Sequence, residues 1–193
     1  KVTQTIVYLP RFVSIIVICS LIKTFTYSDG IINDILAPFL GQRIPFLQEP
    51  KYFRTVYIIS EIWQTMGWDS IIYMAALAGV DQELYEAARV DGAGKLRQLW
   101  CVTLPSIAPT IVVLLIIKVG SMMNIGYEKI ILLYNESIYE TADIISTFIY
   151  RKGLLDFSWS YSTAVGLFNS LCSFVLLISA NFLSRKLTES SLW

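Results

Sequence analysis

Four long apolar stretches, separated by polar connections, dominate the pattern of the chain. They cover residues 5–27, 58–80, 107–127 and 161–183. A helix needs about 20 mostly apolar residues to cross the hydrocarbon core of a bilayer, and each stretch has that length. The last stretch carries no charge, whereas each of the others contains one or two charged residues. The pattern predicts an all-α membrane protein with about four transmembrane helices, which form a single domain over residues 1–193.

The first stretch is the weakest of the four. Its apolar core is short, because Arg11 and Lys23 lie close to either end of it, and a helix lying in the membrane interface is the alternative interpretation. The connection that follows, 28–51, contains many turn-forming residues. Within it a short amphipathic helix is predicted, because five apolar residues fall on one helical face: Ile31, Ile32, Ile35, Leu36 and Phe39.

The connection at 81–105 is polar and is broken by glycines. Asp81 is placed to cap a helix that continues to about Val90. Gly92 and Gly94 interrupt that helix, and we expect Asp91 to cap the helix that follows. Pro105 is expected to end this second helix before the third apolar stretch begins.

Composition narrows the function. Hydrophobic residues make up 55% of the chain and charged residues only 16%, which again indicates a membrane protein. The net charge is zero, which gives no electrostatic support for nucleic-acid binding. There is no histidine, which excludes Ser-His-Asp catalysis and histidine-ligated zinc. Three separate cysteines without a C-x-x-C pair fit small packing residues better than a metal site.

The beginning of the chain carries no targeting signal that we can recognise. It starts at Lys1 rather than at methionine, and Arg11 interrupts the first apolar run. No cleavage site for a signal peptide follows that run. We therefore expect the natural protein to extend further in the N-terminal direction.

The polar connection carries a sequence motif: Glu-Ala-Ala, two residues, Asp-Gly-Ala, and a Leu-Pro pair further on. This resembles the EAA loop of membrane (permease) subunits in binding-protein-dependent ABC importers. The resemblance implies that the loop is cytoplasmic and couples the subunit to an ATPase. The residues that match the motif are Glu86, Ala87, Ala88, Asp91, Gly92, Ala93, Leu104 and Pro105.

The same resemblance implies a set of partners. These are a second related permease, a cytoplasmic ABC ATPase dimer, an extracellular solute-binding protein and the lipid bilayer. ATP and Mg would be bound by the ATPase, and this chain would hold no cofactor or metal and would not be an enzyme. Gly92-Ala93-Gly94-Lys95 is not a phosphate-binding loop, because Arg89 and Leu96 occupy positions where that loop has glycine and Ser or Thr. Members of the family usually have two further N-terminal helices.

Further stretches resemble the carbohydrate branch of the family, which imports oligosaccharides across the bacterial cytoplasmic membrane. They include Trp68-Asp69-Ser70-Ile71-Ile72-Tyr73 and Tyr150-Arg151-Lys152-Gly153-Leu154. The resemblance implies ATP-driven alternating access for an oligosaccharide cargo. The alternatives are a permease for amino acids or another small solute, and an intramembrane scaffold or enzyme without a transport role.

A sugar pathway needs polar groups and flat aromatic faces within the membrane. Candidates lie on the second, third and fourth stretches: Trp63, Gln64, Trp68, Asn124, Tyr127 and Asn169. Glu61 and Asp69 are further functional suspects, because an ionisable group inside a membrane is costly unless it is paired or hydrated. The alternative is that both lie near the outer interface. Lysine and arginine are distributed too evenly between the connections to fix the orientation.

Overall fold

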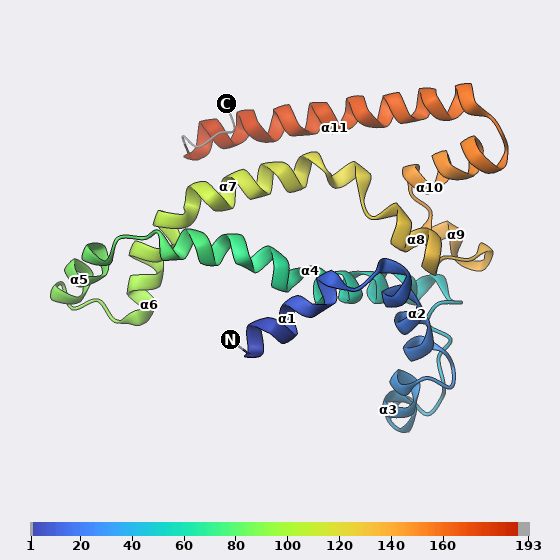
Figure 1. The fold of residues 1–193 in the computed structure, drawn as a ribbon, viewed down its shortest axis with the longest axis horizontal. Helices are drawn as coiled ribbons and strands as arrows, with labels where there is room; N and C mark the ends of the chain where they lie inside the picture. The colour runs from blue at the N-terminus through green and yellow to red at the C-terminus, as the bar shows by residue number, and fades with distance from the viewer. Residues whose placement is uncertain (1, 189–193) are drawn as a thin grey trace. The chain divides into compact units, whose positions relative to one another are not determined.

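The structure, a computed structural model, describes residues 2–188, and every regular element in that range is a helix. The predicted all-α fold is therefore confirmed. The chain forms two compact units: residues 1–68 with 124–169, and residues 69–123 with 170–193. Two long helices, α4 (Pro50–Ala78) and α11 (Trp159–Thr188), contribute to both units (Figure 1).

Three helical stretches are long and apolar enough to cross a membrane: 15–40, 95–120 and 159–186. The last agrees with the predicted span at 161–183. The predicted span at 58–80 lies within α4, which has 29 residues and is about 43 Å long. α4 does not reach the same hydropathy because its first two turns carry Lys51 and Arg54, and Glu61 and Asp69 follow. The number of membrane crossings therefore stays a prediction.

The first unit is built mainly from short helices. They are α1 (Val2–Phe12), α2 (Ile15–Thr26), α3 (Ile31–Leu40), α8 (Tyr127–Leu133), α9 (Tyr139–Ala142) and α10 (Ile145–Tyr150). Two single turns complete it, η3 (Glu136–Ile138) and the π-helical η4 (Arg151–Leu155), and the turn η2 (Met122–Asn124) lies at the boundary between the two units in the sequence. The predicted amphipathic helix is α3, which ends at Gly41 in a left-handed conformation.

The core of the first unit lies where α2, α4 and α8 meet. It contains buried apolar side chains from each of them and from η3 and α9: Ile18, Cys19, Ile22, Phe53, Ile130, Leu133, Ile138 and Ala142. α2 and α8 are thus held together although more than 100 residues separate them in the sequence. This packing fixes the position of the polar side chains on α4 and α8 that are described below.

The predicted helix at 5–27 is divided in two. α1 ends at Phe12, and α2 begins at Ile15 after a break at Val13 and Ser14. Pro10 lies inside α1, two residues before its end. α1 lies so close to α4 that a Cβ at Gly67 would collide with the Val7 carbonyl. The first stretch is therefore a broken helix that packs against α4.

The second unit contains the polar connection and α7. Its helices are α5 (Gln82–Val90), α6 (Lys95–Gln98), the π-helical turn η1 (Leu99–Thr103) and α7 (Leu104–Gly120). Figure 1 shows α5 and α6 as a hairpin between the end of α4 and the start of α7. The predicted span at 107–127 is wrong at its end, because α7 stops at Gly120 and an irregular segment separates it from α8.

The prediction that Pro105 ends the second helix of the connection was wrong. α6, η1 and α7 follow one another without interruption from Lys95 to Gly120. In the π-helical turn the Leu104 N–H bonds to the Leu99 carbonyl, five residues earlier. Pro105 then falls in the first turn of α7, where a missing N–H costs little. The connection that begins at Asp81 therefore passes directly into a helix of membrane-spanning length.

Candidate functional site

The Glu-Ala-Ala motif lies on α5, which is capped at both ends by its own sequence. At the N-terminal end the Asp81 carboxylate accepts a hydrogen bond from the Glu83 N–H at 3.0 Å, as predicted. At the C-terminal end Val90 is the last residue of the helix, and Asp91 is its C-cap. The prediction that Asp91 caps the next helix was wrong, since Gly94 occupies that position.

The rest of the motif forms a Schellman cap on α5. The Gly92 N–H donates to the Arg89 carbonyl at 3.0 Å, and the Ala93 N–H donates to the Ala88 carbonyl at 2.9 Å. This arrangement requires a left-handed backbone conformation at the residue that carries the first of the two N–H groups. That residue is Gly92, whose φ is +74°. Glycine is the residue that adopts this φ without strain. Ala88, Gly92 and Ala93 thus act together as a helix stop.

Two side-chain contacts brace the hairpin. The Gln98 amide donates to the Ala93 carbonyl at 2.7 Å, which fixes the turn against α6. The Tyr85 and Thr103 hydroxyls lie 2.9 Å apart and connect α5 to η1. The two short helices are therefore attached to each other and to the helix that continues into α7.

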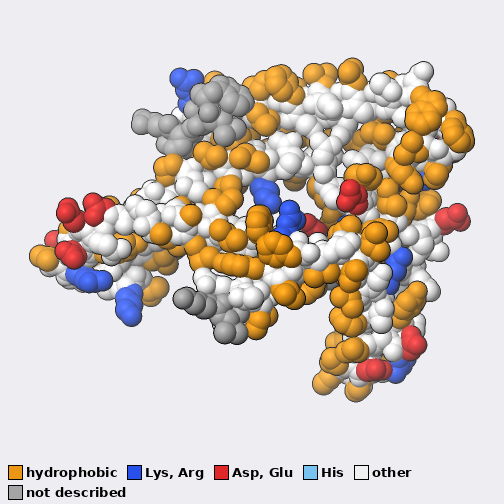
Figure 2. All heavy atoms as spheres, viewed as in Figure 1, with side chains coloured by type: hydrophobic (Ala, Val, Ile, Leu, Met, Phe, Trp, Pro, Cys, Tyr) orange, Lys and Arg blue, Asp and Glu red, His pale blue; other side chains and the backbone are white. Residues whose placement is uncertain are grey.

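No residue of α5, α6 or η1 is buried in the described structure. Val90 is 88% exposed, and Leu96 and Trp100 are also largely exposed. Figure 2 shows acidic, basic and hydrophobic side chains together at the end of the second unit where α5 and α6 lie. The hairpin thus exposes apolar side chains together with charged ones. This is the composition of a protein docking surface. Leu104 and Pro105 lie behind it, at the start of α7.

In the first unit a buried lysine holds two of the polar residues of α4. Lys129 Nζ lies 2.8 Å from Glu61 Oε2 and 3.3 Å from Gln64 Oε1. The Lys129 side chain is only 3% exposed, whereas that of Glu61 is 42% exposed. The Tyr57 ring lies 5.3 Å from the ammonium. A buried ammonium is stable only with such partners, so this cluster positions α8 against α4.

Sequence reasoning missed Lys129 as a member of this cluster. The signal was present, because Lys129 stands next to the uninterrupted apolar run Ile130–Leu133. A charge so close to a core-forming segment indicates a paired position.

Two further predicted residues are brought together. Asn169 Nδ2, near the middle of α11, donates to Asn124 Oδ1 at 2.9 Å, at the end of η2. Asn124 belongs to the irregular segment between α7 and α8, where the backbone has polar groups outside any long helix. Irregular backbone at membrane depth occurs where it is enclosed by protein or lines an aqueous cavity.

The aromatic candidates lie in different surroundings. Trp63 lines an apolar groove with residues of α2 and α3. None of the residues in the Lys129 cluster lines this groove. Trp68 packs edge-on against Phe12, with the ring centroids 5.8 Å apart. Tyr127 is the exposed first residue of α8. The structure therefore does not gather the six predicted pathway residues in one cavity.

Glu61 and Asp69 each have a lysine partner of their own. Asp69 pairs with Lys118 of α7 at 3.2 Å, inside the second unit. The two carboxylates therefore do not form the pair with each other that an intramembrane acid–base enzyme would need. No group of three metal-ligating side chains occurs within the searched part of the chain.

A bidentate ion pair joins Asp143, which lies between α9 and α10, to Arg151, the first residue of η4. Arg151 donates to both Asp143 oxygens, at 2.9 and 2.5 Å, and Thr147 donates to one of them. Burial opposes ionisation of Asp143, but the hydrogen bonds from Arg151 and Thr147 outweigh it and hold the pKa of the carboxyl below its ordinary value. This pair ties the start of α10 to η4.

The comparisons with known proteins agree with this architecture. Residues 1–189 match the family described as "Binding-protein-dependent transport system inner membrane component". The chain belongs to this family of inner membrane transport components.

Two curated relatives from Bacillus subtilis (strain 168) resemble the whole chain. The polygalacturonan/rhamnogalacturonan transport system permease protein YteP is 43% identical over 194 residues, and Protein LplB is 42% identical over 191 residues. These matches cover 100% and 98% of this chain but 60% of each relative. The chain therefore spans about three fifths of the length of these proteins.

Solved structures show the same fold. One is a bacterial alginate ABC transporter in complex with alginate pentasaccharide-bound periplasmic protein. A chain of that structure is 44% identical and matches with a TM-score of 0.94, over 99% of this chain and 67% of the other. A second structure, of a bacterial ABC transporter involved in the import of the acidic polysaccharide alginate, gives 45% identity and a TM-score of 0.93. It covers 97% of this chain and 66% of the other.

Proposed function

We propose that this chain is the core of a permease subunit that imports oligosaccharides across the cytoplasmic membrane by ATP-driven alternating access. The observation that carries the proposal is the exposed α5–α6 hairpin. Its motif residues build a Schellman cap and present Ala87, Val90 and Leu96 to the outside. The second helix of the hairpin, α6, is the beginning of the 26-residue helical stretch Lys95–Gly120, which is apolar enough to span the bilayer.

This geometry suits the transmission of force. A docked partner that pushes on α5 acts on a helix whose two ends are capped and whose side is attached to η1 through Tyr85 and Thr103. Because α6, η1 and α7 are continuous, movement of the hairpin displaces α7 as well. Rigid elements of this kind carry alternating-access motion.

The proposed partners follow from this arrangement. The hairpin lies in the cytoplasm and docks on an ABC ATPase dimer, which binds ATP and Mg; this chain itself holds no cofactor. A second related permease completes the pathway. The turn at 41–50 and the segment 128–160 lie on the outer side, where an extracellular solute-binding protein delivers the cargo. Support for an oligosaccharide cargo comes from the relatives, two of which are named for polygalacturonan and alginate transport.

The test is reconstitution of the full-length protein in proteoliposomes with its partner permease, its ATPase and its solute-binding protein. We expect ATP-dependent uptake of labelled oligosaccharides, and ATP hydrolysis that rises when the loaded binding protein is added. The matched control is the same complex with the ATPase omitted, which should take up nothing. Assembly of the complete complex without oligosaccharide uptake, combined with uptake of amino acids, would overturn the proposed cargo.

A further inference from the structure

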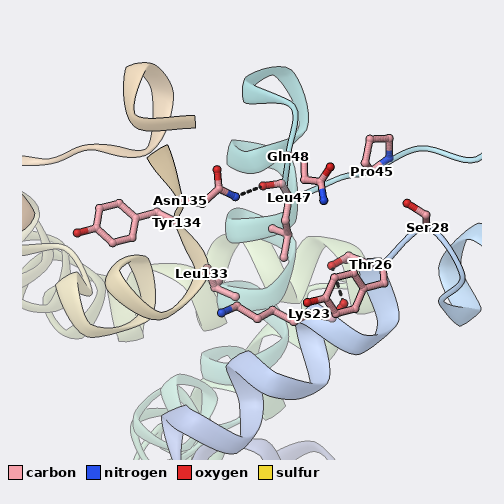
Figure 3. Close-up of a pocket in the computed structure, with 10 residues that line it drawn as sticks. Lys23, Thr26, Ser28, Pro45, Leu47, Gln48, Leu133, Tyr134 and Asn135 are labelled. Carbon is pink, nitrogen blue, oxygen red and sulfur yellow. Dashed lines mark hydrogen bonds between the residues drawn. The ribbon is translucent and has the colours of Figure 1, made fainter. Parts of the chain in front are cut away.

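A small pocket with both polar and apolar lining residues lies in the first unit at the end of α2. It has a volume of about 170 Å³. The residues that matter for its chemistry come from α2, from the turn before α4 and from the end of α8: Lys23, Tyr27, Leu47, Gln48, Leu133 and Asn135. Figure 3 shows Lys23 extending beside Leu133, while Gln48 enters from the turn. None of these residues belongs to the predicted pathway set.

The walls of this pocket are fixed by hydrogen bonds. The Asn135 amide donates to the Leu47 carbonyl at 2.9 Å, which joins α8 to the turn before α4 (Figure 3). Asn33 is completely buried and donates at 2.8 Å to the carbonyls of both Tyr27 and Ile44. These bonds hold the turn beside the end of α2. The pocket is therefore preformed, as small-molecule sites usually are.

Three polar side chains of the pocket make no contribution to the hydrogen bonds and ion pairs of the described structure. Lys23, Tyr27 and Gln48 make no side-chain hydrogen bond or ion pair with any residue that the structure describes. Lys129 and Lys118, by contrast, each have a carboxylate within 3.2 Å. Lys23 is half-buried and has no anionic partner among the described residues. A cation in that position favours an anionic ligand.

We propose that this pocket binds one anionic sugar unit, a uronate, of the oligosaccharide cargo. Lys23 pairs with the carboxylate, Gln48 and the Tyr27 hydroxyl bond to ring hydroxyls, and Leu47 and Leu133 contact the apolar face of the ring. The pocket volume accommodates one pyranose unit. This inference rests on the proposed function and adds to it a preference for acidic cargo and the position of one subsite.

A competing occupant is an acidic side chain of the solute-binding protein. The number of polar groups favours the sugar, because a carboxylate side chain would engage Lys23 alone, while the exposed Gln48 and Tyr27 would stay hydrated. A uronate presents a carboxylate and several hydroxyls at once. The experiment below separates the two occupants.

The test compares acidic and neutral forms of one cargo in the reconstituted full-length transporter. An oligogalacturonate and its methyl ester of equal length are the probes. Lys23→Met keeps the aliphatic part of the side chain and removes the charge. We expect this variant to lower the uptake rate of the acid about tenfold relative to the wild type, and to leave that of the ester within about twofold. Each ratio to the wild type cancels any preference of the binding protein itself.

Two further variants complete the design. Lys152→Met removes a charge from the same unit outside the pocket, where Lys152 pairs with Asp156, and should leave both rates unchanged. Gln48→Ala, in an exposed turn, should also reduce uptake of the acid, which tests the pocket independently if Lys23→Met fails to assemble. Equal rates for wild type and Lys23→Met with both probes would overturn the subsite.

The remaining outcomes are also decisive. If Lys23→Met slows both probes equally and more binding protein is needed for half-maximal ATP hydrolysis, the pocket receives the binding protein and the sugar subsite is overturned. A failure of the proposed function is seen separately, because then the wild-type complex takes up neither probe.

Discussion

At the scale of single residues, the hairpin shows that neighbouring glycines have different roles. Gly92 has φ +74° and completes the Schellman cap, whereas Gly94 has φ −67° and simply precedes α6. A Cβ at either position would meet nothing within 4 Å. The room for a side chain is therefore the same at both positions. Only the positive φ of Gly92 makes glycine the favoured residue there.

The first prediction uses this pair of glycines. Gly92→Val forces a β-branched residue into the left-handed region, which costs about 1–3 kcal/mol and opens the cap. We expect binding-protein-stimulated ATP hydrolysis to fall at least about tenfold, with the subunit still in the membrane. Gly94→Ala is the matched control and should retain nearly full stimulation. Normal stimulation in the Gly92 variant would show that the cap does not transmit the signal.

The second prediction concerns Lys129 and Glu61. Glu61→Met leaves the buried ammonium without its anion and should lower the stability of the full-length protein by about 3–5 kcal/mol. Lys129→Met leaves a carboxylate that is partly exposed, so its effect should be smaller. The double variant removes both charges and should be more stable than Glu61→Met alone. Thermal unfolding of the purified protein measures all three; additive effects would mean that the two side chains are not coupled.

At the scale of elements, local signals were predictable and long-range ones were not. Asp81, Val90 and Gly92 define α5 through bonds between residues close in sequence, and the helix start and stop were read correctly. The π-helical turn before Pro105 and the break after Gly120 were not foreseen, because a proline or an apolar run permits several backbone courses. The Lys129 cluster joins residues 65 and 68 positions apart, and no periodicity reports such a contact.

The third prediction concerns the element formed by α9, α10 and η4. Asp143→Asn removes the charge that receives Arg151 and Thr147, and the loss of charged hydrogen bonds costs about 1.5–3 kcal/mol. We expect amide hydrogen exchange over residues 143–155 to become at least about tenfold faster at pH 7. Lys152→Met, which affects only an exposed ion pair, is the control. Unchanged exchange in Asp143→Asn would show that the pair does not stabilise this segment.

The pH dependence of the same segment follows from the lowered pKa of Asp143. A carboxyl whose folded-state pKa is depressed adds stability above its unfolded pKa of about 3.9 and loses it as the pH falls through the lower folded value. Protection of residues 143–155 in the wild type should therefore decrease in that acidic range. Asp143→Asn should lack this component of the decrease.

At the scale of the whole molecule, the matches to solved structures support the fold over more of the chain than the hydropathy pattern does. Three helical stretches satisfy the length and apolarity of a span, while α4 is longer than any bilayer requires and carries two ion-paired carboxylates. α4 is not among these three stretches, although both of its carboxylates have a lysine partner. The matches to solved transporter chains, with TM-scores of 0.94 and 0.93, cover nearly the whole chain and include α4.

The last prediction is the topology that the proposed function requires. The hairpin must face the cytoplasm, and α4 must then place the turn before Pro50 on the outer side. Both test positions, Lys95 and Gln48, are exposed, whereas Asn135 is unsuitable because its amide is bonded to Leu47. The exposed native Cys101 is first replaced by serine. A membrane-impermeant thiol reagent added to intact cells should then label Gln48→Cys and leave Lys95→Cys unlabelled, while permeabilised cells should give labelling at both. Strong labelling of Lys95→Cys in intact cells would place the hairpin outside, where it could not reach a cytoplasmic ATPase.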